Sequence, residues 1–113
     1  MRITLPKSKY VLELKDFMSN KVFREYQKIL VLDTDVVGGK DVEIKIKMAQ
    51  IYEAQDFVLK DSIVSLSDEN GNSLEKPFDV IQDLSVEDGN VIYAKVQELI
   101  NGSTMDEKVK KNG

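Results

Sequence analysis

The spacing of apolar residues changes within the first thirty positions, and this change constrains the fold more than any other feature. Apolar and polar residues alternate in Ile3-Thr4-Leu5 and again from Tyr10 to Leu14, which is the period of a half-buried β-strand. We therefore predict strands over 2–5 and 10–15, joined by a short polar turn. After Ser19 the apolar residues follow helical spacing, which predicts a helix that Asp16 or Ser19 caps. Its apolar stripe is Val22, Phe23, Tyr26, Ile29 and Leu30.

The middle of the chain predicts a loop and then a second long helix. Segment 32–41 combines acidic residues with Gly38-Gly39, and this composition predicts a mobile loop. Alternation from Val42 to Met48 indicates a short strand or an extended approach to a helix. We predict that helix over about 47–62, with Ile63, Val64 and Leu66 continuing its apolar content towards a turn at 68–72. Its expected buried face is Met48, Ile51, Tyr52, Gln55, Val58 and Leu59, and its expected opposite face is Gln50, Glu53, Asp56 and Lys60.

The last third of the chain predicts two helical segments. Pro77 suits the first position of a short helical turn, in which Phe78, Ile81 and Leu84 share one side. Ser85-Val86-Glu87-Asp88 resembles a capping box, with Asp in place of Glu or Gln, and opens the last helix. Asn101-Gly102 is expected to end that helix. Its buried stripe is Ile92, Val96, Leu99 and Ile100.

Together these patterns predict an α+β fold, in which an N-terminal antiparallel β-hairpin packs against two long α-helices and one short helical turn. A chain of 113 residues suits a single domain. We place this domain at residues 1–102, with a mobile acidic and glycine-containing loop at about 32–41 and a flexible Lys-rich tail over 103–113. Tyr10, Leu12 and Leu14 are assigned to the core, whereas the hairpin edge and the acidic loop are expected to meet partners.

The residue types exclude most catalytic and metal chemistry. The chain contains no His and no Cys, so the commonest general base, the thiol nucleophile and the usual zinc ligands are absent. Two pairs of carboxylates, Glu53 with Asp56 and Glu87 with Asp88, fall on expected helix surfaces or caps, which favours solvation over chemistry. We predict a non-catalytic protein with no cofactor and no metal.

Charge and hydropathy limit the classes of partner. The formal net charge of −4 disfavours a general attraction to nucleic acid. Lys21, Arg24 and Lys28 share one face of the first helix near Tyr26, but Glu25 lies among them. No apolar run approaches the roughly 20 residues that a membrane helix needs, and the N-terminus lacks a signal-peptide pattern. We therefore expect no membrane partner, and nucleic acid is a less favoured one.

Four stretches of the chain carry a family resemblance. They are Ile3-Thr4-Leu5-Pro6 with 11–17, the Lys/Arg-rich helix with the Asp-, Val- and Gly-rich gap after it, 51–56 leading into 63–66, and 84–93 leading into the last helix. In this order they resemble the tail assembly chaperones of long-tailed (siphovirus-type) bacteriophages, over roughly residues 1–102. These short proteins are made from the gene that precedes the tape-measure gene. The chain departs from the pattern at Leu66, where many relatives carry Trp.

The resemblance implies a chaperone that binds the long, helical tape-measure protein, keeps it soluble and recruits major tail-tube protein around it. Such a protein acts in the host bacterial cytoplasm and leaves before the virion is finished. It needs accessible apolar side chains, and our candidate contact residues are Val36, Val37 and Phe57. Self-association is a further expectation.

Two other roles stay open beside the chaperone. One is a structural tail or connector subunit that is retained in the virion, and the less favoured one is a small nucleic-acid-binding regulator. The family often makes a longer form by ribosomal frameshifting, and the Lys-rich segment 107–112 would suit an A-rich slippery message and a flexible linker.

Overall fold

The chain forms one three-stranded sheet and four helices in the part that the structure describes. The computed structural model describes the backbone of residues 1–31 and 48–112, and the side chains of residues 1–30 and 48–102. In chain order the elements are β1 (Arg2–Thr4), β2 (Val11–Leu14), α1 (Asn20–Val31), α2 (Met48–Ser62), β3 (Ile63–Ser67), α3 (Pro77–Gln82) and α4 (Val86–Asn112). The predicted α+β class is confirmed. The predicted acidic loop and the alternating segment before α2 lie outside the described residues.

β2 is the central strand of the sheet, because β1 and β3 both pair with it in antiparallel orientation. Leu12 lies opposite Ile3 on one side and opposite Leu66 on the other, so one row of the sheet is entirely apolar. The prediction that residues 63–66 continue α2 towards a turn is wrong, since they form β3. Two causes favour the strand: its first residues are β-branched, and the second edge of β2 needs a hydrogen-bonding partner.

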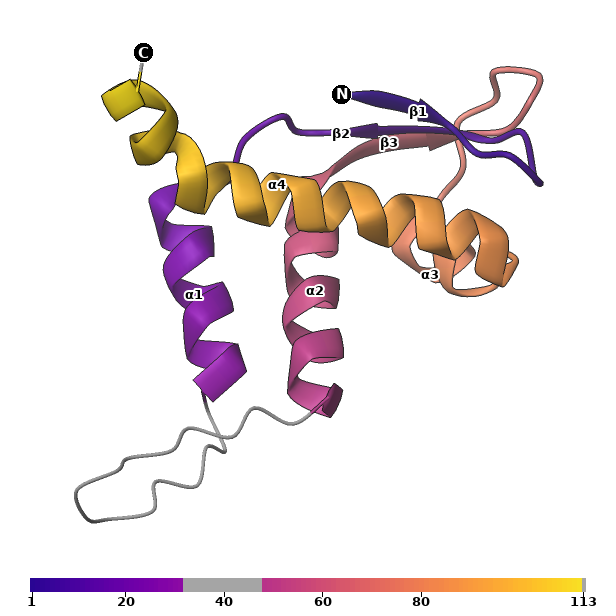
Figure 1. Cartoon of the computed structure of the whole chain (residues 1–113). Coiled ribbons are helices and arrows are strands. Elements are labelled where there is room, and N and C mark those ends of the chain that lie inside the picture. Colours follow the sequence, from indigo (N-terminus) through magenta and orange to yellow (C-terminus); the bar gives the residue numbers. More distant parts are fainter. Residues whose placement is uncertain (32–47, 113) are drawn as a thin grey trace.

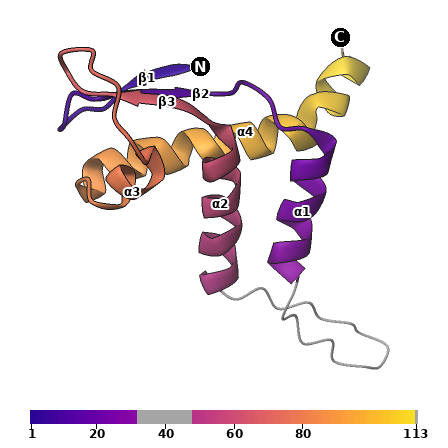
Figure 2. The ribbon, with the colours of Figure 1, turned by 180° about the vertical axis from the view of Figure 1, so that it is seen from behind.

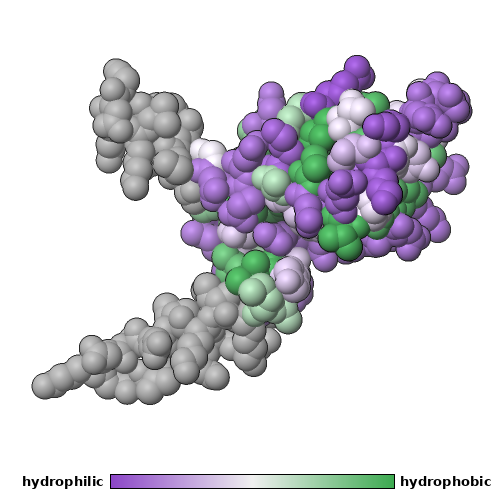
Figure 3. Space-filling view, turned by 45° about the vertical axis from the view of Figure 1, so that its right-hand side comes forward, coloured by the Kyte–Doolittle hydropathy of each residue, from purple (hydrophilic) through white to green (hydrophobic). Residues whose placement is uncertain are grey.

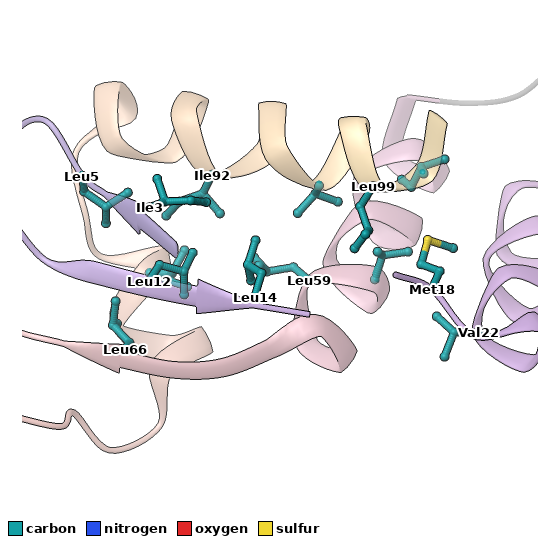
Figure 4. Packing of buried hydrophobic residues seen from close by; sticks show 14 residues of the cluster. Ile3, Leu5, Leu12, Leu14, Met18, Val22, Leu59, Leu66, Ile92 and Leu99 are labelled. Carbon is teal, nitrogen blue, oxygen red and sulfur yellow. The ribbon is translucent and has the colours of Figure 1, made fainter. Parts of the chain in front are cut away.

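The core fills the space between the sheet and α4, which lies along one face of it (Figures 1 and 4). α1 and α2 run side by side and antiparallel, and they extend away from the sheet in one direction (Figures 1 and 2). We call this pair the helical arm. The buried cluster joins the sheet to all three of the long helices. Its members are Ile3, Leu5, Leu12, Leu14, Met18, Val22, Val58, Leu59, Leu66, Ile81, Ile92, Val96, Leu99 and Ile100.

The buried face of α2 differs from the predicted one. Gln50, Ala54 and Val58 are buried at intervals of four residues, whereas Met48 and Tyr52 are each 60% exposed. A helix that packs against two neighbours buries a wider face than its stripe of large apolar residues. Small and polar residues are therefore buried, and two large ones that the pattern assigned to the core lie on the surface.

The predicted helix starts are confirmed, but the predicted end of the last helix is wrong. The Oγ atoms of Ser19 and Ser85 accept hydrogen bonds from the N–H groups of Val22 and Asp88, at 3.2 and 3.1 Å. α4 continues through Asn101-Gly102 as far as Asn112. A glycine inside a helix costs only about 1 kcal/mol relative to alanine, so Gly102 does not suffice to stop it.

Asp88 joins the turn between β1 and β2 to the start of α4. Its side chain is 1% exposed, and its Oδ1 and Oδ2 accept hydrogen bonds from the backbone N–H groups of Lys7 and Ser8, at 2.8 and 2.9 Å. Burial acts to raise the pKa of Asp88, but these donors outweigh it and hold the pKa below its ordinary value. The expectation of a solvated carboxylate beside Glu87 is wrong, because the hairpin turn covers Asp88.

Alanine should have opposite effects at two glycines. Gly71 lies in the 68–72 turn with φ of +87°, whereas Gly89 lies within α4, and an added Cβ meets no heavy atom within 4 Å at either site. Gly71→Ala is expected to lower the free energy of unfolding by about 1 kcal/mol, because positive φ strains an L-residue. Gly89→Ala is expected to raise it by about 1 kcal/mol, because alanine favours the helix. Urea unfolding measures both changes, and shifts of the same sign would contradict this assignment.

Candidate partner-binding surface

The exposed side of α2 carries two hollows that meet at Tyr52 and Asp56. The first, which we call the arm hollow, has a volume of about 530 Å³ and is lined by Ile29, Ala49, Tyr52, Glu53, Asp56, Phe57 and Lys60. The second, which we call the polar hollow, has a volume of about 360 Å³ and is lined by Tyr52, Gln55, Asp56, Gln82, Asn90 and Tyr93. We call the two hollows together the α2 surface.

The arm hollow has apolar walls from both helices of the arm. Ile29 comes from α1, and Ala49 and Phe57 come from α2. Phe57 is half-buried and packs against the core while it also lines the hollow, so its role as a contact residue stays a prediction. The other two predicted contact residues, Val36 and Val37, lie outside the described residues.

Two large side chains are exposed on α2 at this end of the arm: Tyr52 lines the arm hollow, and Met48 directly precedes its lining residue Ala49. Met48 and Tyr52 are each 60% exposed, and Figure 3 shows hydrophobic surface near the end of the helical arm. Aromatic residues and methionine are enriched at protein–protein interfaces, where they supply most of the binding energy. Because both residues lie on an ordered helix, binding of a partner there would cost little backbone entropy in α2.

A hydrogen-bond network shapes the polar hollow. The Tyr93 hydroxyl donates to Asp56 Oδ1 at 2.5 Å and accepts from Gln82 Nε2 at 3.1 Å, which ties α2 to α3 and α4. Burial raises the pKa of Tyr93 to about 12, and the bond to Asp56 adds to this rise. The phenol therefore stays protonated and keeps donating at neutral pH. Sequence reasoning missed this network, because no local pattern connects positions 56, 82 and 93.

The basic residues of α1 lie apart from an accessible aromatic ring. Lys21, Arg24 and Lys28 are exposed, and Lys28 Nζ lies 3.2 Å from Glu25 Oε1. Tyr26 is half-buried, packs against the core and stacks on Phe23, with ring centroids 6.2 Å apart. Nucleic-acid surfaces combine cations with aromatic rings that are free to stack on bases, and the described part of α1 does not offer this combination.

Other kinds of site find no support within the described residues. No group of three acidic, histidine or cysteine residues there could hold a metal ion. None of the helices in that part of the chain has the length and the apolar content to cross a membrane. Comparisons of the chain with protein-family models, with curated proteins and with solved structures found no match. The α2 surface is therefore a candidate on its geometry and chemistry alone.

Proposed function

We propose that the chain is a non-catalytic assembly chaperone, of the kind that its sequence resembles, which binds a phage tape-measure protein through the α2 surface and keeps it soluble. One observation carries this proposal: Met48 and Tyr52 are exposed on an ordered helix, at a hollow whose walls combine apolar with charged side chains. A long helical client exposes apolar stripes before it is assembled, and such a stripe can lie in a groove with large apolar side chains at its edge.

Repetition would make this binding effective. One arm hollow covers only a short part of a long client, so each contact is weak, but many copies bound along one client together cover its stripe. Weak individual contacts also suit release when major tail-tube protein assembles around the client. We therefore place the protein in the host cytoplasm during tail assembly and outside the finished virion.

A structural tail or connector subunit is the alternative that the same surface could serve. The two roles differ in where the protein ends up, and mass spectrometry of purified virions separates them. A stoichiometric amount of the chain in the virion would contradict the chaperone role. A long helical reading frame immediately downstream of its gene is expected on the chaperone role, and its absence would count against it.

Tyr52→Ser is expected to abolish the effect on the client. Loss of a central interface aromatic typically costs about 2 kcal/mol or more, which is roughly a 30-fold loss of affinity. Tape-measure protein that is co-expressed with this variant should pellet, as it does with no chaperone present. The assay is the soluble fraction of tape-measure protein after centrifugation.

Phe17→Ser provides the matched control. Phe17 is 65% exposed and lies outside the α2 surface, so this variant removes an aromatic ring of similar exposure and should keep the client soluble. Circular dichroism checks that both variants are folded. Equal losses for the two variants, or an unchanged effect with Tyr52→Ser, would contradict the proposal.

A further inference from the structure

The polar hollow has the chemistry of a site for a guanidinium group. Two tyrosine rings, from Tyr52 and Tyr93, and the carboxylate of Asp56 line it together with the amides of Gln55, Gln82 and Asn90. None of these lining residues is basic, so the hollow holds one acidic group and no cation of its own. A positively charged group would therefore complement it.

Hydrogen bonds within the network leave acceptors available. Tyr93 occupies Oδ1 of Asp56, and among the described residues no group donates to Oδ2. Gln55 and Gln82 use their amide N–H groups to donate to Gln97 and Tyr93, at 3.3 and 3.1 Å. Their carbonyl oxygens therefore remain as acceptors.

The nearest basic side chain on α2 is directed to another element. Lys60 lies one turn after Asp56, but its Nζ is 4.6 Å from the ring centroid of Phe78 in α3. No ion pair forms between Lys60 and Asp56, and Lys60 does not line the polar hollow. Asp56 and Lys60 both line the arm hollow, but Asp56 has no ion-pair partner on the helix that carries it.

We propose that the polar hollow receives an arginine side chain of the bound partner, with its guanidinium group on Asp56 and against the Tyr52 ring. Arginine fits better than lysine, because its planar fork donates to a carboxylate and to amide carbonyls at once and stacks on an aromatic face. A volume of about 360 Å³ is at the small end of ligand sites, which span about 300–1,000 Å³, and suits a single side chain.

This inference deepens the proposed function, and rests on it only for the identity of the partner. The client helix would place apolar residues in the arm hollow and an arginine in the polar hollow, with Tyr52 between them. The α2 surface would then select helices that carry an arginine beside an apolar stripe, rather than apolar helices in general.

An NMR titration with a matched pair of probes tests the site. N-acetyl-arginine amide and N-acetyl-citrulline amide have nearly the same shape, but only the first is charged. The arginine probe is expected to shift the ring resonances of Tyr52 and Tyr93 in a saturable way, with a dissociation constant of order millimolar. The citrulline probe should bind at least ten times more weakly. Equal binding of the two probes, or no saturable shift with either, would overturn the inference.

Three variants sharpen the test. Asp56→Asn should weaken binding of the arginine probe about tenfold or more, whereas Glu69→Gln, which changes an exposed residue in the 68–72 turn, should leave it unchanged. Tyr52→Leu should weaken binding of the arginine probe several-fold. Because Tyr52 is exposed, this variant should fold, and it keeps the test decisive if Asp56→Asn does not. Unchanged binding with Tyr52→Leu and with a folded Asp56→Asn would overturn the inference, as would equal losses with Asp56→Asn and Glu69→Gln.

The outcomes separate this inference from the proposed function. If the arginine probe does not bind but Tyr52→Ser still abolishes solubilisation of the client, the arginine site is wrong and the chaperone role stands. If the probe binds as expected but the chain has no effect on the tape-measure protein, the arginine site stands and the chaperone role is wrong.

Discussion

Asp88→Ala is expected to lower the free energy of unfolding by about 3 kcal/mol, although Asp88 lines neither hollow of the α2 surface. The variant removes the acceptors for the backbone N–H groups of Lys7 and Ser8. A hydrogen bond to a charged group contributes about 1.5–3 kcal/mol, and both of these bonds are partly buried. Glu87→Ala, at the exposed neighbouring position, should cost at most about 1 kcal/mol through the helix dipole.

The contribution of Asp88 should also depend on pH. Its pKa in the folded protein lies below the ordinary value of 3.8, so the unfolded chain binds a proton more readily than the folded one. The stabilisation is therefore fully present above the ordinary pKa, and it is lost as the pH falls through the lower folded pKa. Urea unfolding at several pH values should show the gap between wild type and Asp88→Ala shrinking below about pH 4. A gap that stays constant from neutral pH to pH 3 would contradict the stabilising role of the Asp88 carboxylate.

Leu12→Ala is expected to cost about 3 kcal/mol, within the range of 2–5 kcal/mol for such truncations. Leu12 is fully buried in the central strand, opposite Ile3 and Leu66. Truncation leaves a cavity between the sheet and α4 that neighbours on both sides cannot close without losing their own contacts. Denaturant unfolding, with the slope compared between variants, measures this loss.

Val11→Ala is the control for the core side of the sheet. Val11 precedes Leu12 on the same strand, is half-buried and belongs to the opposite face. Its truncation should cost less than about 1 kcal/mol, because ordinary surface substitutions change stability by about 0.5 kcal/mol. If Val11→Ala and Leu12→Ala lower the free energy of unfolding by similar amounts, α4 does not cover the face of the sheet that carries Leu12.

Local signals in the sequence predicted most elements correctly. The alternation before Lys15, the helical spacing after Ser19 and the proline at 77 each act over a few residues. β1, β2, α1 and α3 occur where these signals place them. Serine caps act over a single turn, so the starts of α1 and α4 could also be predicted. Phe57 could be proposed as a contact residue from its type alone; it lines the arm hollow, and its role as a contact stays a prediction.

Non-local contacts decided the features that the sequence missed. β3 forms because the edge of a strand some fifty positions earlier needs a partner, and Asp88 is buried because the first hairpin lies over it. The spacing of Tyr52 predicts a buried position, yet the contacts of α2 with its neighbours leave it exposed. The polar hollow brings together three helices, so no window of sequence contains it.

The sequence by itself determined where β1, β2 and the starts of the four helices lie, and it excluded chemistry that needs histidine or cysteine. Both follow from residue types and from periods of a few residues. Only the tertiary structure decided which face of α2 is covered, because a helix with apolar residues on more than one side is buried by whichever neighbours reach it. The tertiary structure also decided the burial of Asp88 beneath the first hairpin and the exposure of Tyr52. The candidate site depends on the second of these, because Tyr52 lines both hollows together with Asp56.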